Sequence, residues 1–277
     1  MKEFISEKFH DHLSGSFTPA EIKNLIRIYW EDKGQALTPK SPQSLDQVEY
    51  DISLILKGTP IQYVTGKSFF YDRIFQVNEH VLIPRPETEE LVSIILKDHH
   101  EKATYHDLSI LDIGTGSGCI PIILKSRLNV AIIHTIEVSY EAVLVAMKNA
   151  LMYDLEINFH HTDFLDEKSW KDLPNTDIIV SNPPYIQESE RKIMSDSVLN
   201  YEPESALFPR GIDPLIFYRK IALFASNKLK EDGKVYVEIN EYLALETVEV
   251  FESRGFGVQL IEDLQGKPRI IIASTNT

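Results

Sequence analysis

Four consecutive residues, Asn182-Pro183-Pro184-Tyr185, have the composition of a site that holds a planar NH2 group. The side-chain oxygen of Asn182 and the backbone carbonyl of Pro183 can each accept one N–H of such a group. Both hydrogen bonds strengthen as positive charge develops on the nitrogen, which stabilises the transition state. The two prolines stiffen the backbone, and Tyr185 offers a flat face. The motif therefore predicts catalysis at an amide or aromatic amino nitrogen, and the alternative is a proline turn after a strand.

A second motif has glycine at alternate positions and precedes a predicted helix. Glycine lets a ligand approach the backbone closely, and the N–H groups of a helix N-terminus can bind it. The spacing is GxGxG, so it differs from the GxGxxG of dinucleotide-binding loops. The motif predicts a cofactor site made by Gly114, Thr115, Gly116, Ser117 and Gly118. The alternative is a tight turn between a strand and a helix.

A carboxylate, Glu137, ends the next predicted strand, Ile132–Glu137. A carboxylate at this place can accept hydrogen bonds from both hydroxyl groups of a ribose. Without the glycine loop, a solvated strand end would be the simpler interpretation. With the glycine loop, Glu137 is predicted to bind the ribose of a cofactor.

The elements that must position these motifs alternate between strand and helix from about residue 108 onward. Short apolar runs such as Ile110–Ile113 and Ile178–Ser181 predict buried strands. The alternation is typical of an α/β fold with a mainly parallel, doubly wound, Rossmann-like sheet. Ligands of such sheets bind at the carboxyl ends of the strands, where the glycine loop, Glu137 and Asn182 are all expected.

The chain divides into three predicted regions. Residues 1–58 are expected to form a small helical domain, because apolar residues recur at helical spacing and Thr18-Pro19-Ala20-Glu21 has the composition of a helix start. Residues 59–84 are expected to be a β-hairpin linker, with a short strand at Ile61–Val64. Residues 85–277 are expected to form the α/β domain, which contains every motif described above.

Composition limits the classes of function. The 277 residues carry a net charge of −14, which repels phosphate backbones, so nucleic acid is not the expected substrate. The single cysteine, Cys119, suits a reducing compartment, and we expect it to be a small buried residue rather than a nucleophile. No signal peptide or membrane span is predicted, so a cytoplasmic protein is expected. The nine histidines lack metal-ligand spacing, and no metal is expected.

The two motifs together resemble the class I methyltransferases that act on planar NH2 groups. Further segments narrow the resemblance, namely Gly58–Gly66, Leu82–Glu89, Tyr201-Glu202-Pro203 and Ala206-Leu207. With them the chain resembles the peptide chain release factor glutamine methyltransferases. The resemblance is specific from about residue 58 onward, and before that only the helical character matches.

This resemblance implies a seven-stranded methyltransferase domain, S-adenosyl-L-methionine as the cofactor, and an N-terminal helical bundle that helps to dock the release factor. It implies that Asp163 binds the adenine amino group and that Phe164 is a flat neighbour of the ring. Asn182 would lie between cofactor and substrate. The glutamine would be held by Asn182, Pro183, Pro184 and Tyr185. The chain departs from the family at Glu137, where aspartate is common, and the residue after Asp163 varies among relatives.

The implied reaction is direct, in-line methyl transfer to the N5 amide nitrogen of the glutamine in the Gly-Gly-Gln loop of a release factor. No covalent intermediate, metal or essential base is expected. A glutamine methyltransferase acting on a ribosomal protein would share the motif and stays an alternative. An N6-adenine DNA methyltransferase would share it too, but would need a basic cleft. A non-enzymatic binding module is disfavoured by the intact loop and Asn182. The sequence does not determine the oligomeric state, and a monomer is the expectation.

Overall fold

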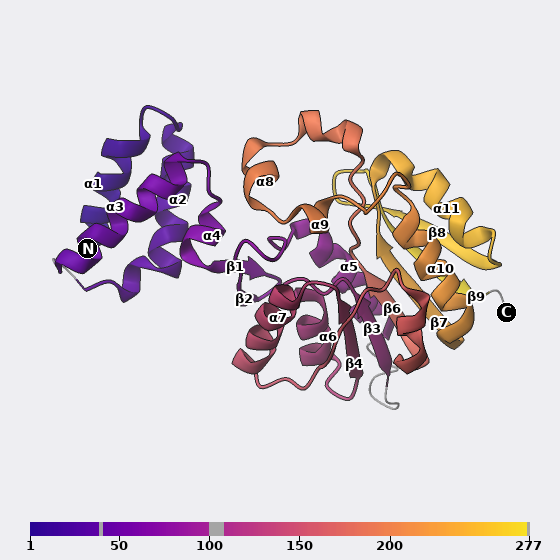
Figure 1. Ribbon diagram of the computed structural model, residues 1–277. Coiled ribbons are helices and arrows are strands. Elements are labelled where there is room, and N and C mark those ends of the chain that lie inside the picture. Colours follow the sequence, from indigo (N-terminus) through magenta and orange to yellow (C-terminus); the bar gives the residue numbers. More distant parts are fainter. Residues whose placement is uncertain (39–40, 100–107, 276–277) are drawn as a thin grey trace.

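The computed structural model describes residues 1–38, 41–99 and 108–275. It contains an N-terminal helical unit and an α/β domain, and a short hairpin lies between them (Figure 1). Nowhere in these ranges is there a helix long and apolar enough to cross a membrane.

The helical unit has its own apolar core. Its second helix begins where the sequence predicts, because the Thr18 hydroxyl accepts the Glu21 N–H and the Glu21 carboxylate accepts the Thr18 N–H. The Tyr29 hydroxyl donates to the buried Asp51 carboxylate at 2.7 Å, and Lys33 pairs with the same oxygen at 2.7 Å. The buried charge is therefore compensated inside the unit. Its three longer helices are α1 (Lys2–Leu13), α2 (Pro19–Asp32) and α3 (Pro42–Leu56).

The segment after residue 58 differs from its prediction. The sequence predicts a strand at Ile61–Val64, but the segment forms helix α4 (Ile61–Thr65), so this prediction is wrong. Gly66 ends the helix in the left-handed conformation at φ +72°. Ile61 and Val64, three residues apart, pack into the core of the helical unit. Local β propensity is weak, and burial of two apolar side chains on one helix face outweighs it.

The α/β domain is built on a seven-stranded sheet with the strand order β5-β4-β3-β6-β7-β9-β8. The first five strands in this order are parallel, and β9 is antiparallel to both of its neighbours. The predicted mainly parallel sheet is confirmed. The strands are β3 (Ser109–Ile113), β4 (Ile132–Glu137), β5 (Asn158–His161), β6 (Thr176–Ser181), β7 (Leu229–Glu238), β8 (Phe256–Glu262) and β9 (Pro268–Thr275).

Helices cover both faces of this sheet, as the doubly wound fold requires. One apolar core lies between the sheet and α5, α6 and α7, and a second lies between the sheet and α10 and α11. The helices of the domain are α5 (Pro86–His99), α6 (Cys119–Arg127), α7 (Tyr140–Met152), α8 (Asp196–Tyr201), α9 (Glu204–Leu207), α10 (Ile216–Lys228) and α11 (Ala244–Glu252).

The predicted hairpin follows α4. Strand β1 (Lys67–Phe70) pairs antiparallel with β2 (Arg73–Gln76). The side chain of Asn149, on α7, accepts the Gln76 N–H at 2.7 Å and donates to the Gln76 carbonyl at 2.9 Å. It also donates to the Ser117 carbonyl at 2.8 Å. One buried amide therefore joins the hairpin to the glycine loop.

The strand order reverses at β3, which has β4 on one side and β6 on the other. At such a switch point the loops that leave adjacent strands diverge toward opposite faces of the sheet, and a crevice opens between them. The glycine loop follows β3, Glu137 ends β4 and Asn182 follows β6. The fold thus gathers the three motifs at one edge of the sheet.

Candidate active site

The loop after β3 requires glycine because its backbone is left-handed. Gly114, Gly116 and Gly118 have φ angles of +77°, +52° and +81°. A Cβ atom at Gly114 or Gly116 would meet nothing within 4 Å, whereas one at Gly118 would lie 3.1 Å from the Cβ of Ala146 on α7. The first two glycines therefore leave open space beside the backbone, and the third allows close packing of the loop on a helix.

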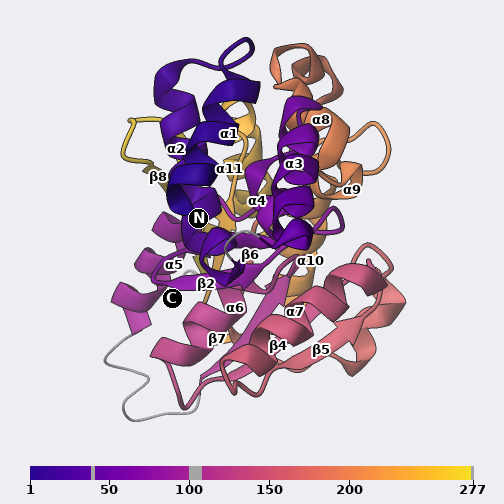
Figure 2. The same cartoon turned by 90° about the vertical axis from the view of Figure 1, so that its left-hand side faces the viewer.

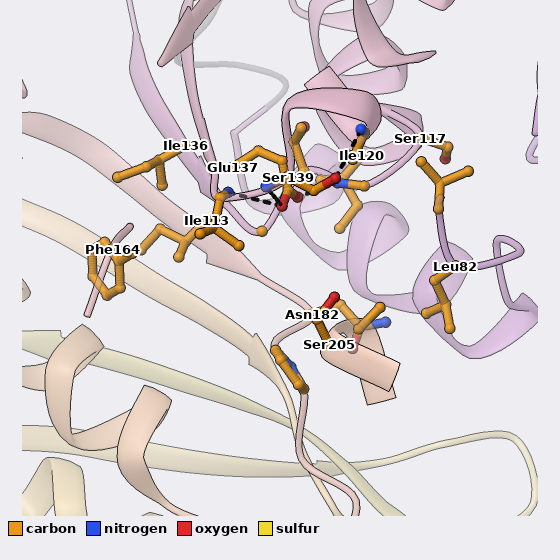
Figure 3. A pocket seen from close by; sticks show the side chains of 18 of the residues that line it. Leu82, Ile113, Ser117, Ile120, Ile136, Glu137, Ser139, Phe164, Asn182 and Ser205 are labelled. Atoms are coloured by element: carbon orange, nitrogen blue, oxygen red, sulfur yellow. Dashed lines mark hydrogen bonds between the residues drawn. The ribbon is translucent and has the colours of Figure 1, made fainter. Parts of the chain in front are cut away.

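Three backbone N–H groups hold the Glu137 carboxylate at the end of β4. It accepts from Gly116 at 3.0 Å, from Val138 at 2.9 Å and from Ser139 at 3.0 Å (Figure 3). An ionised carboxylate has about four lone-pair sites, so acceptor capacity remains for a ligand. Binding of a ribose by Glu137 stays a prediction.

A cavity lies over the carboxyl ends of these strands, at the switch point where sheets of this kind bind their ligands. Figure 3 shows Glu137 and Asn182 among the side chains around it, with Phe164 toward one end and Leu82 toward the other. The residues predicted for the site that line this cavity are Gly114, Thr115, Gly116, Ser117, Glu137, Asp163, Phe164, Asn182 and Pro184.

Asp163 and Phe164 line this cavity from the segment after β5. The Phe164 ring is buried and packs on Trp170, with ring centroids 5.4 Å apart. The Asp163 carboxylate accepts the Leu165 N–H at 2.9 Å and pairs with Arg210 at 3.0 Å. The ion pair is largely exposed and therefore weak, so it leaves the carboxylate accessible to another donor. The adenine contacts of both residues stay predictions.

Buried polar groups without partners lie at the glycine loop. Both carboxylate oxygens of Asp112 and the hydroxyls of Thr115 and Ser117 lack a hydrogen-bond partner among the residues that the structure describes. Burial raises the pKa of Asp112 to about 7, and the nearby Thr115 hydroxyl acts against this rise without reaching full hydrogen-bond geometry. Because buried polar groups are normally hydrogen-bonded, this cluster fits a site that receives a polar ligand, and Thr115 and Ser117 line the cavity itself.

A chain of hydrogen bonds supports Asn182 from behind. Its Nδ2 donates to the Thr88 hydroxyl oxygen at 3.0 Å, and the Thr88 hydroxyl donates to Glu238 at 2.6 Å. The Tyr185 hydroxyl donates to the other oxygen of Glu238 at 2.9 Å. Burial raises the pKa of Tyr185 far above its usual value, so it stays a neutral phenol. Residues of α5, β6 and β7 are thus joined into one network.

A second cavity adjoins the first and shares several lining residues with it. Pro183 and Tyr185, which do not line the first cavity, line this one, and Asn182 lines both. Asn182 is therefore at the junction between the two. The other residues around the second cavity are Leu82, Arg85, Ile186, Met194, Ser195, Val198, Ala206 and Leu207.

Thr88 and Arg85 are site residues that the sequence analysis did not single out. Arg85 pairs with the buried Glu202 at 2.5 Å and lines both cavities. Glu238 carries the network behind Asn182. Its place at the carboxyl end of a strand was the available signal. Nothing near Thr88 in the sequence indicates its role, because its partner Glu238 lies 150 positions away.

Other candidate chemistry is not supported by the geometry. In the part of the chain that the structure describes, no group of three or more His, Cys, Asp and Glu side chains could hold a metal ion. Cys119 is buried, and burial raises the pKa of its thiol to about 12. The thiol is therefore protonated at neutral pH, unlike a catalytic nucleophile.

The fold and the site define a methyltransferase. The Methyltransferase small domain family matches residues 90–220, which include the glycine loop, Glu137 and the segment Asn182–Tyr185. A solved methyltransferase from Pyrococcus furiosus aligns over 86% of this chain and 100% of its own, with a TM-score of 0.51 and 17% identity. That likeness shows a shared fold.

Closer relatives identify the family. A release factor glutamine methyltransferase of Lactococcus lactis subsp. lactis is 41% identical over 271 residues, 96% of each chain. One from Flavobacterium psychrophilum is 45% identical over 213 residues, 76% of this chain and 74% of its own. The chain belongs to the release factor glutamine methyltransferase family, which confirms the resemblance drawn from its motifs.

Proposed function

We propose that this chain transfers a methyl group from S-adenosyl-L-methionine to the N5 amide nitrogen of a glutamine in the Gly-Gly-Gln loop of a peptide chain release factor. The observation that carries the proposal is the position of Asn182 at the junction of two cavities. The first cavity, over the glycine loop and Glu137, is assigned to the cofactor, and the second, beside Pro183 and Tyr185, to the glutamine.

The residues around the first cavity fit the cofactor. When bound, S-adenosyl-L-methionine supplies an electrophilic methyl group. Gly114 and Gly116 leave room for a ligand against the backbone. Glu137 keeps acceptor capacity for a ribose hydroxyl, and the buried hydroxyls of Thr115 and Ser117 can bond to polar groups.

The residues around the second cavity fit the side chain of glutamine. Apolar side chains such as Met194 and Val198 suit its methylene groups. At the junction, the Asn182 oxygen and the Pro183 carbonyl can accept hydrogen bonds from the two N–H groups of the amide, and these hydrogen bonds strengthen as positive charge develops on the nitrogen. Tyr185, anchored on Glu238, offers its flat face. The amide proton leaves to water after transfer, so no residue has to act as a base.

We further propose that the helical unit helps to bind the release factor. Helix α8 lies against the end of α3 (Figure 2), where the Tyr201 hydroxyl donates to the Lys57 carbonyl at 2.6 Å and the Ser197 hydroxyl donates to the Gly58 carbonyl at 2.9 Å. The same helix contributes Val198 to the second cavity. A protein bound to the helical unit is thereby placed beside the glutamine site.

The test is methyl incorporation from labelled S-adenosyl-L-methionine into a release factor, its Gln→Ala variant, a ribosomal protein and DNA. We expect incorporation into the unchanged factor and none into the Gln→Ala variant. Incorporation that persists in the variant would refute the glutamine assignment. Preferential labelling of the ribosomal protein would favour that alternative substrate. Preferential labelling of DNA would contradict the expectation drawn from the net charge of −14.

A further inference from the structure

The hydrogen bonds behind Asn182 have a fixed direction. An ionised carboxylate only accepts hydrogen bonds, and each oxygen of Glu238 accepts one, from the Thr88 hydroxyl at 2.6 Å and from the Tyr185 hydroxyl at 2.9 Å. A hydroxyl has a single proton, and that of Thr88 is already donated in the hydrogen bond to Glu238. Thr88 can therefore only accept at its 3.0 Å contact with Asn182, which makes the Asn182 amide NH2 the donor.

We propose that Thr88 and Glu238 are positioning residues that decide which end of the Asn182 amide faces the substrate. With Nδ2 bound to Thr88, Oδ1 is the end left for the substrate. The proposal rests on the proposed function, in which Asn182 accepts an N–H of the glutamine amide. A half-turn about the Cβ–Cγ bond of Asn182 would set its NH2 group against the NH2 group of the substrate amide. Two donors would then face each other, and no hydrogen bond could form between them.

Packing alone does not select between these two orientations, because the oxygen and NH2 ends of an asparagine amide are nearly the same size. The choice therefore has to come from its partner. Thr88 is buried, lines the cofactor cavity and belongs to α5, while Glu238 is buried at the end of β7. Both are held by packed elements of the domain, so the orientation is set before any substrate arrives.

The direction holds only while Glu238 is ionised. Burial raises the pKa of Glu238, and the hydrogen bonds from Thr88 and Tyr185 act against this. Below that pKa, protonated Glu238 can donate to Thr88, whose own proton then becomes available to the Asn182 oxygen. Turnover should therefore fall on the acid side. The titratable and charged groups around Glu238 are Glu87 on α5, Tyr185 after β6, Tyr218 on α10 and Arg269 on β9.

Two substitutions at Thr88 separate its hydroxyl from its volume. Thr88→Val keeps the shape and removes the hydroxyl, whereas Thr88→Ser keeps the hydroxyl. We expect T88V to lower kcat for methyl transfer by about 10-fold or more, less than the loss on deleting a direct transition-state contact. T88S should restore most of the rate. Unchanged kcat in folded T88V would overturn the proposal.

Thr247 on α11 provides a matched control. It is also fully buried, and its hydroxyl donates to the Leu243 carbonyl at 2.7 Å. Thr247→Val removes a buried hydroxyl outside both cavities, so it should change thermal stability and leave kcat unaltered. An equal fall of kcat in T247V and T88V would mean that any lost buried hydroxyl slows the enzyme, which would overturn the positioning role.

Glu238→Gln tests the direction of these hydrogen bonds through the pH dependence of kcat. Wild-type kcat should decline toward low pH as Glu238 takes up a proton. The variant cannot ionise at this position and should show a lower kcat without that decline. An acid-side decline that persists unchanged in E238Q would overturn the role assigned to Glu238.

A measurement without substrate separates this proposal from the proposed function. The side-chain NH2 resonances of Asn182 can be assigned by their absence in Asn182→Asp. They should move in T88V and stay close to their wild-type positions in T88S and T247V. If the wild-type chain transfers no methyl group to a release factor, the proposed function is refuted. The Asn182 resonances would still test the role of Thr88. Resonances that do not move in T88V would overturn it.

Discussion

At the scale of single residues, the proposed chemistry depends most on Asn182. Asn182→Ala removes an acceptor whose hydrogen bond is strongest in the transition state. We expect turnover to fall by roughly 10²–10³, as when one preorganised polar contact is deleted. Cofactor affinity, measured by calorimetry, should change little. Near-normal turnover in the folded variant would mean that another group holds the target nitrogen.

Gly116 tests the cofactor assignment. Its φ of +52° disfavours any side chain, and the space beside it is the space assigned to the ligand. Gly116→Val should therefore weaken binding of S-adenosyl-L-methionine strongly, by at least about 10-fold, or about 1.4 kcal/mol. Gly15→Val is the control, because Gly15 lies in the helical unit and a Cβ there meets nothing within 4 Å. Equal calorimetric affinities in the two variants would refute the assignment.

Asp112 should make stability depend on pH. Its pKa is raised to about 7 by burial, against about 3.9 in an unfolded chain. Between these values the folded state holds a proton that the unfolded state releases, so stability falls as pH rises. The Tm of the wild-type chain without cofactor should therefore fall from about pH 4 to about pH 7, relative to that of Asp112→Asn. Parallel Tm curves for the two proteins would contradict the raised pKa.

Asp263 is a control for Asp112, because its contribution to stability should depend on pH in the opposite direction. A backbone hydrogen bond from Lys267 is the main reason that its pKa lies below the usual value. Its contribution to stability is therefore present at neutral pH and is lost as pH falls through the acid range. Relative to Asp263→Asn, the wild-type Tm should fall toward low pH, opposite to the trend at Asp112.

At the scale of elements, α8 couples the helical unit to the glutamine site. The double variant Ser197→Ala, Tyr201→Phe removes its two hydrogen bonds to Lys57 and Gly58. We expect KM for the release factor to rise several-fold, because the docking unit is then less well fixed beside the site, while cofactor affinity stays the same. Tyr242→Phe, at an exposed tyrosine, is the control. Equal KM values in both proteins would argue against a coupling role for α8.

At the scale of the whole molecule, substrate selection is assigned to surface outside the reacting centre. A free glutamine side chain is small and common, so remote binding energy has to position the target loop. A truncation that starts at Gly66 removes the helical unit together with α4, whose Ile61 and Val64 would otherwise be exposed. If the remaining domain stays folded, methylation of the whole factor should fall far more than cofactor affinity.

A short peptide of the Gly-Gly-Gln loop completes this test. It cannot contact the helical unit, so it should be a poor substrate for the full chain and for the truncated chain alike. Methyl incorporation is measured for the full chain and the truncated chain, each with the folded factor and with the peptide. A peptide methylated as fast as the folded factor would show that the helical unit does not contribute to recognition.

The sequence alone determined the α/β class, the mainly parallel sheet and the positions of the main motifs. These follow from local signals: short apolar runs, the left-handed glycine loop after β3, Glu137 at the end of β4, and Asn182 after β6. Parallel strands place such ends at one edge, so even their proximity could be predicted. The sequence erred at Ile61–Val64, where the neighbouring helices, and not local propensity, decide the structure.

Only the tertiary structure decided what supports the site. Thr88 and Glu238 are 150 positions apart, and no local pattern connects them. The two cavities that meet at Asn182, and the contacts of α8 with Lys57 and Gly58, likewise depend on segments far apart in the chain. Backbone motifs are readable from sequence because they depend on neighbours along the chain. The direction of a hydrogen bond depends on neighbours in space, and folding is what brings these together.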